Sequence, residues 1–306
     1  MARINLSVLC VSLTYQVLLE SGFYERVYGP DVTAARERAR APDDPERKVV
    51  ETRLMLWALG FSFVPQLALT LGLLYAGSGT RPAELGLTTR RFGRNVLAGV
   101  IAGVVLIPGV TGLQLLIVQV YRFLGAPGVQ EHPFSTLGQH GLLPAEWVLL
   151  VVCATVVAPV WEELLFRGIL QPWFATRPWG GHVAVAAALF LALARRADAL
   201  AAGWRESPQA LLEAAVPVLA LLALVPVYLI VWWRSRTPVA PALFGTALLF
   251  AWVHVSAWPS PVPLVLLGLG LGYLAFRTQS LVGPIVVHCL VNLTACVELF
   301  VSLRWG

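Results

Sequence analysis

Charged residues and cysteines are scarce in this sequence. Asp, Glu, Lys and Arg make up only 13% of the 306 residues, whereas a soluble domain has about 25%. So little charge argues against a soluble enzyme, a nucleic-acid-binding protein and a disordered chain. The four cysteines all lie in apolar stretches and form no CxxC pair, so neither a zinc finger nor a disulfide framework is expected.

Apolar residues are abundant instead. They make up 58% of the chain, and the mean hydropathy is +0.73. A membrane-spanning helix needs roughly 20 residues, so this composition is enough for about eight or nine spans. The apolar runs are continuous rather than alternating, which argues against a transmembrane β-barrel, and a helix satisfies its own backbone groups in lipid. The sequence therefore predicts an all-α, polytopic transmembrane helical bundle of about eight to nine helices.

Basic residues exceed acidic ones and give a net charge of +5. Basic residues at helix ends contact anionic lipid headgroups, so membrane lipid is an expected partner and nucleic acid is not. We expect residues 1–306 to form a single integral-membrane domain, multi-pass, in the cell (inner) membrane. Residues 77–95 carry four arginines and residues 255–262 carry none, which favours a cytoplasmic position for 77–95.

Hydropathy divides the chain into expected helices. A first, uncleaved helix is expected at 4–19, before the strongly polar segment 20–53. The other helices are expected near 45–74, 96–121, 147–170, 182–194, 210–233, 238–255, 263–276 and 280–303, with a polar break at 195–208. The helix at 96–121 carries Gly99 and Gly103 in a GxxxG arrangement, which permits close contact between helices in a bilayer.

Charged residues inside the expected helix at 147–170 are the first functional signal. A charged side chain in a bilayer is costly, so an intramembrane carboxylate indicates function. Glu163 and Arg167 are four residues apart on one helical face and are expected to form a structural ion pair. Glu162 points about 100° away from Glu163 and lacks this local partner. An unpaired carboxylate in an apolar setting suits a general base.

Two further helices carry polar residues one turn apart. Phe250 precedes His254 by four residues, and His288 precedes Asn292 by four. Glu162, His254, His288 and Asn292 could converge between three helices, with facing side-chain atoms within about 4–6 Å if they share a water or a metal ion. Glu162, His254 and His288 could bind zinc, since zinc hydrolases use one Glu and two His ligands. The same residues could equally activate water without a metal.

These residues lie in three short motifs. EELLFR (Glu162–Arg167), FAWVH (Phe250–His254) and HCLVN (His288–Asn292) resemble, in order, the EExxxR, FxxxH and HxxxN motifs of the CPBP family. That family includes the type II CAAX prenyl endopeptidases and the Abi-type bacteriocin-processing and immunity proteins. The resemblance covers roughly 145–303, which would be the protease core, with 195–233 as a helical insertion between the first two motifs.

The resemblance implies an intramembrane endopeptidase that cleaves a peptide or a lipidated peptide. Glu162 and His254 would activate the attacking water, and His288 and Asn292 would complete the site and stabilise the oxyanion. Structural support would come from Glu163, Arg167 and Phe250.

Two other classes of function stay open on the sequence. A non-catalytic membrane scaffold or immunity factor could keep this fold and use it for binding. A proton-coupled transporter also places carboxylates and histidines within the membrane, although we see no internal repeat of the kind that many transporters show. Replacing Glu162 by glutamine separates the classes, since only an enzyme should lose a peptidase activity.

Overall fold

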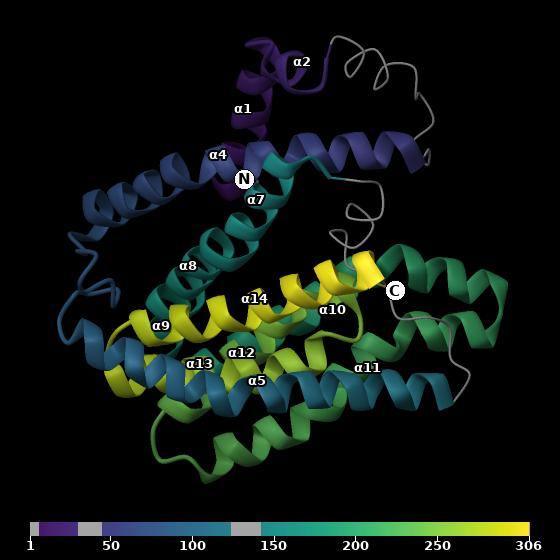
Figure 1. Cartoon of the computed structure of the whole chain (residues 1–306). Helices are drawn as coiled ribbons and strands as arrows, with labels where there is room; N and C mark the ends of the chain where they lie inside the picture. The colour runs from purple at the N-terminus through teal and green to yellow at the C-terminus, as the bar shows by residue number, and fades with distance from the viewer. Residues whose placement is uncertain (1–5, 30–44, 124–141, 306) are drawn as a thin grey trace. The chain divides into compact units, whose positions relative to one another are not determined.

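The computed structural model describes residues 6–29, 45–123 and 142–305, and within them the chain is helical, with turns but no strand (Figure 1). The all-α prediction is therefore confirmed. In chain order the elements are α1 (Leu6–Glu20), α2 (Phe23–Tyr28), α4 (Pro45–Ser78), α5 (Phe92–Phe123), α7 (Pro144–Val152), η1 (Cys153–Val157), α8 (Ala158–Glu163), η2 (Leu164–Leu170), α9 (Gln171–Ala175), α10 (Gly180–Glu206), α11 (Pro208–Arg234), α12 (Val239–Trp252), η3 (Val255–Ala257), α13 (Pro261–Thr278) and α14 (Val282–Trp305).

Six helical segments in the described part of the chain are long and apolar enough to cross a membrane. They are Val50–Ser78, Phe92–Phe123, Pro144–Ala175, Pro208–Arg234, Pro261–Thr278 and Val282–Trp305. Helix α12 is a shorter apolar helix. The protein is therefore a multi-pass integral membrane protein.

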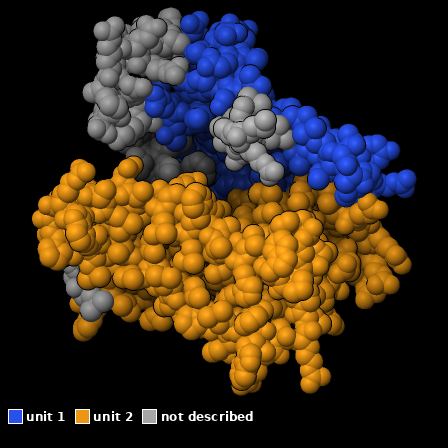
Figure 2. Space-filling view, turned by 180° about the vertical axis from the view of Figure 1, so that it is seen from behind, with its two compact units in different colours: residues 1–81, 131–161, 292–306 blue, residues 82–130, 162–291 orange. Residues whose placement is uncertain are grey.

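The chain divides into two compact units that interleave in the sequence (Figure 2). Unit 1 contains residues 1–81, 131–161 and 292–306, and unit 2 contains residues 82–130 and 162–291. The single domain over 1–306, its core at 145–303 and the insertion at 195–233 stay predictions.

A buried carboxylate joins three helices of unit 1. Glu146 on α7 is fully buried and accepts hydrogen bonds from the Tyr28 hydroxyl on α2 and from the Leu143 backbone amide. Trp57 on α4 donates from its indole nitrogen to the Tyr28 oxygen over 2.8 Å. Burial, and then the hydrogen bond and charge of Glu146, raise the pKa of Tyr28 above its usual value.

Helix α12 is the centre of unit 2. Its residues from Gly245 to Trp252 are all buried, and it packs against α9, α10, α11 and α13. The indole nitrogen of Trp252 donates to the carbonyl of Pro217 on α11 over 3.1 Å. Residues 195–233 thus include a part of α11 that packs directly against the helix carrying Phe250.

The polar stretch at 195–208 does not interrupt the helix that precedes it. Helix α10 continues through Glu206, because this stretch is rich in alanine and arginine, which favour helix. The chain turns only at Ser207, whose hydroxyl accepts the Ala210 amide at the start of α11, with Pro208 in the first turn.

The GxxxG glycines of α5 face α14 within unit 2. A Cβ on Gly99 would lie 2.7 Å from the carbonyl oxygen of Gly283 and 2.9 Å from Val286. A Cβ on Gly103 would lie 3.2 Å from Leu290. These small residues allow α5 to approach the segment of α14 that carries His288.

Candidate active site

The first motif lies where the helix changes from α to π geometry. Helix α8 ends at Glu163, and the π-helical segment η2 begins at Leu164. Single π turns inside α-helices are frequent at functional sites. The guanidinium Nη1 of Arg167 donates to Glu163 Oε1 over 2.9 Å, and both side chains are almost completely buried. The predicted pair between Glu163 and Arg167 is therefore present.

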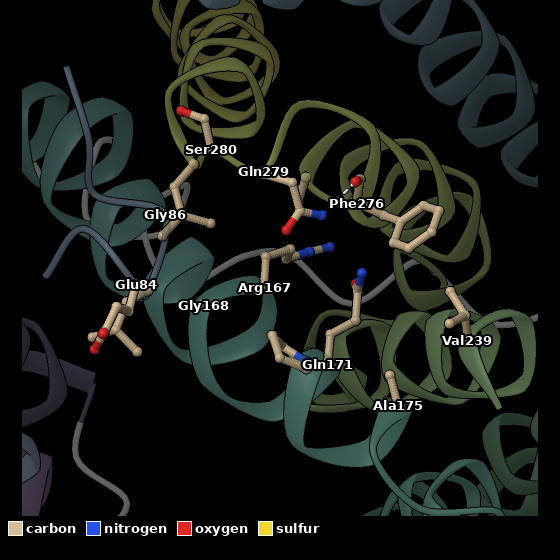
Figure 3. Close-up of a pocket in the computed structure, with 14 residues that line it drawn as sticks. Glu84, Gly86, Arg167, Gly168, Gln171, Ala175, Val239, Phe276, Gln279 and Ser280 are labelled. Atoms are coloured by element: carbon tan, nitrogen blue, oxygen red, sulfur yellow. Dashed lines mark hydrogen bonds between the residues drawn. The ribbon is translucent and has the colours of Figure 1, made fainter. Parts of the chain in front are cut away.

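Arg167 also connects this helix to two others in unit 2. Its guanidinium carbon lies 4.3 Å from the centre of the Phe250 ring, and Nη2 donates to the Gly268 carbonyl of α13 over 3.4 Å. One turn along, the amide nitrogen of Gln171 donates to the Gly272 carbonyl over 3.0 Å. Arg167 and Gln171 line a cavity of about 160 Å³ near the end of α13 (Figure 3). A Cβ on Gly272 would lie 2.7 Å from Gln171 Oε1. The absence of a side chain at Gly272 therefore makes the hydrogen bond between Gln171 and the Gly272 carbonyl possible.

His254 lies in the turn after α12, with one ring nitrogen held by the backbone. Nδ1 lies 2.9 Å from the Phe250 carbonyl oxygen. A carbonyl oxygen only accepts, so this geometry places a proton on Nδ1. Nε2 then faces Glu162, with 3.8 Å between it and Oε1.

His288 on α14 has the same arrangement with a different partner. Nδ1 lies 2.9 Å from Glu163 Oε1, and Nε2 lies 3.7 Å from Glu162 Oε2. The Phe250 ring contacts both imidazoles, with centroid distances of 5.3 Å to His254 and 5.6 Å to His288. Phe250 thus packs against three polar members of the cluster, since it also lies under Arg167.

Glu162 lies between the two imidazoles without a direct hydrogen bond to either. Both distances exceed the length of a hydrogen bond. Its Oε2 atom is buried and has no hydrogen-bond partner among the described residues. The Glu162 and His254 side chains are 22% and 32% exposed, whereas those of His288 and Glu163 are 4% and 0% exposed. The accessible side of the cluster is therefore the side of Glu162 and His254.

The structure brings together most of the residues singled out by the sequence, with one contact that the sequence did not predict. The facing atoms of Glu162, His254 and His288 lie within the predicted distance. Glu163 was expected to pair with Arg167, and besides this pair it accepts a hydrogen bond from His288. Helical spacing signals a partner four residues away, but it carries no signal for one that is 125 residues away.

Asn292 belongs to unit 1, where its amide nitrogen donates to the Ala154 carbonyl over 2.8 Å. Its convergence with Glu162, His254 and His288 stays a prediction.

Zinc binding requires several ligand side chains that converge on one point. Among the described residues no three His, Cys, Asp or Glu side chains form a group that could hold a metal ion as they stand. Zinc binding by Glu162, His254 and His288 stays a prediction.

A family comparison covers all three motifs. Residues 144–244 and 223–294 match the family model described as type II CAAX prenyl endopeptidase Rce1-like. The chain belongs to this family of CPBP intramembrane proteases. No curated protein and no solved structure matches the chain.

Proposed function

We propose that the protein is an intramembrane endopeptidase in which Glu162 activates the water that attacks the peptide bond. The observation that carries this proposal is the geometry of Glu162. Its two carboxylate oxygens face the Nε2 atoms of His254 and His288 at 3.8 Å and 3.7 Å, and the other nitrogen of each ring has its own partner.

These distances suit a water molecule held between carboxylate and imidazole. A water oxygen about 2.8 Å from each of two atoms that are 3.7 or 3.8 Å apart subtends an angle of roughly 85° between them. Each Nε2 lone pair can accept a hydrogen bond from water, and so can the carboxylate. The site is therefore rich in acceptors and suited to a molecule that brings donors.

The balance of charge favours Glu162 as the base. The cluster contains two carboxylates and one guanidinium, and Arg167 binds Glu163 at 2.9 Å. Oε2 of Glu162 has no hydrogen-bond partner among the described residues, so its lone pairs are free to take a proton. Glu162 would take a proton from water as the hydroxide oxygen bonds to the carbonyl carbon. It would then return that proton to the amine as the C–N bond breaks.

The imidazoles would act on the same intermediate. His254, the more exposed of the two, would orient the attacking water together with Glu162. His288, after taking a second proton from solvent at Nε2, would donate from this nitrogen to the tetrahedral oxyanion, with Asn292 as the predicted second donor. Zinc at Glu162, His254 and His288 is the alternative form of this proposal, in which the ion would supply Lewis-acid chemistry.

The substrate would be a peptide or lipidated peptide that reaches the site from the bilayer of the cell (inner) membrane. The match to the type II CAAX prenyl endopeptidase model supports an enzyme over a transporter. A non-catalytic scaffold or immunity factor with this fold is the alternative.

The decisive experiment compares wild type with Glu162→Gln. Both proteins are assayed in lipid nanodiscs on a fluorogenic prenylated peptide ending in C-a-a-X, and cell membranes containing each are compared by proteomics. Glu162→Gln should abolish cleavage, because the amide cannot act as the base. The protein should stay folded, because the amide is nearly isosteric with the carboxyl group. The matched control is Glu206→Gln, an exposed carboxylate on α10, which should cleave like wild type. Full activity in Glu162→Gln would remove Glu162 as the base, and absence of any wild-type cleavage product in both assays would favour the scaffold.

A further inference from the structure

We infer that Glu163 is a positioning residue that selects which nitrogen of His288 faces Glu162. This inference rests on the proposed function and gives Glu163 a role in the reaction beyond its ion pair with Arg167. The contact that carries it joins Glu163 Oε1 and His288 Nδ1 over 2.9 Å.

The contact determines the protonation of one nitrogen. A carboxylate only accepts hydrogen bonds, so Nδ1 carries the proton in this contact. In histidine, the partner of one ring nitrogen determines the state of the other. With Nδ1–H bound to Glu163, Nε2 is the nitrogen available at Glu162 Oε2, 3.7 Å away. Without Glu163, the neutral imidazole could carry its single proton on Nε2 instead of Nδ1. Nε2 would then no longer offer a lone pair at Glu162.

Arg167 keeps Glu163 in place. Its Nη1 donates to the same Oε1 atom that accepts from His288, also over 2.9 Å. Arg167 is itself held by the Gly268 carbonyl and by the face of Phe250. Glu163 Oε1 is therefore held between two contacts of 2.9 Å, one to Arg167 and one to His288. The order of contacts is thus Arg167, Glu163, His288, Glu162.

A purely structural role for Glu163 makes different predictions. If Glu163 only compensates the charge of Arg167, removing both charged groups together should leave His288 and the reaction unchanged. If Glu163 positions His288, that double replacement should disturb the ring even in a folded protein. The pair can be replaced together because swapping a buried ion pair for apolar side chains is often neutral for stability.

The test therefore compares two double variants that differ only at position 163. Glu163→Met/Arg167→Met removes the acceptor, whereas Glu163→Gln/Arg167→Met keeps an uncharged amide oxygen that can accept from His288. Histidine is labelled with ¹⁵N in the ring, the proteins are placed in lipid nanodiscs, and the His288 signals are assigned from their loss in His288→Gln. A thermal melt checks that each variant is folded.

The spectrum and the kinetics give separate results. In wild type the His288 Nδ1 signal should be that of a protonated nitrogen. In Glu163→Met/Arg167→Met, the Met/Met variant, this signal should shift toward the position of an unprotonated nitrogen. The Met/Met variant should also lose kcat on the fluorogenic peptide by a factor on the order of 10² to 10⁴, with KM within about 3-fold. Glu163→Gln/Arg167→Met should recover part of the Nδ1 protonation and part of kcat.

An Nδ1 signal that is the same in wild type and in a folded Met/Met variant would overturn the inference, as would an unchanged kcat. If Met/Met does not fold, Glu163→Leu/Arg167→Leu, which also removes the acceptor, is read by the same ring signals. An Nδ1 signal equal to that of wild type, together with an unchanged kcat in this variant, would also overturn the inference. The ring spectrum needs no substrate. If wild type cleaves nothing, the proposed function fails while the spectrum still decides whether Glu163 controls the ring.

Discussion

Replacing Arg167 by alanine should destabilise the protein strongly. The substitution removes a guanidinium that is almost completely buried and leaves Glu163, which is fully buried, without its cationic partner. It also removes the hydrogen bond to Gly268 and the contact with the Phe250 ring.

The magnitude follows from the burial of both partners. Breaking a buried ion pair from one side costs about 3–5 kcal/mol, because the remaining charge is uncompensated. At roughly 2–4 °C per kcal/mol, the melting temperature should fall by on the order of 10 °C. Replacing Glu163 and Arg167 together by methionine should cost much less than the sum of the single replacements, since no unpaired charge remains.

The assay is thermal unfolding in detergent, followed by intrinsic tryptophan fluorescence. Arg205→Ala, which removes an exposed arginine of α10, is the matched control and should change the stability by less than about 0.5 kcal/mol. If Arg167→Ala melts at the wild-type temperature, the guanidinium is solvated in the folded protein and the argument from a buried pair is wrong.

Three further predictions concern packing, pH and metal. Gly99→Ala should lower the melting temperature, because its Cβ would lie 2.7 Å from the Gly283 carbonyl oxygen. Gly112→Ala on the same helix, where a Cβ would have nothing within 4 Å, should leave the melting temperature unchanged or raise it. Equal melting temperatures of the two variants would contradict the close contact at Gly99. The raised pKa of Tyr28 contributes stability that is fully present below the usual tyrosine pKa of 10.0 and is lost as the pH rises above it, so the melting temperature of wild type should fall more between pH 9 and pH 11 than that of Tyr28→Phe, and parallel curves would refute this. Dialysis against a chelator should leave cleavage of the fluorogenic peptide unchanged if the side chains act without a metal, whereas a loss that zinc alone restores would establish the zinc alternative.

Local sequence properties were enough to predict the class of fold and one contact of the site. The long apolar runs predict helices because the bilayer leaves each span to satisfy its own backbone hydrogen bonds. The pair Glu163 and Arg167 follows from a spacing of four residues, since one helical turn brings such residues to the same face. Motif spacing alone likewise singled out Glu162, His254 and His288, although it could not say which atoms face one another.

Tertiary structure decided how these helices and side chains are combined. The polar stretch 195–208 carries charges that suggest a break, yet α10 runs on through Glu206 before Ser207 ends it. The contact of Glu163 with His288 joins two helices that are 125 residues apart. Helical periodicity acts over one or two turns and places a side chain on a face, but the partner across that face depends on how the helices pack. In unit 2 this packing relies on small residues such as Gly99 and Gly268, where the missing side chain lets one backbone approach another.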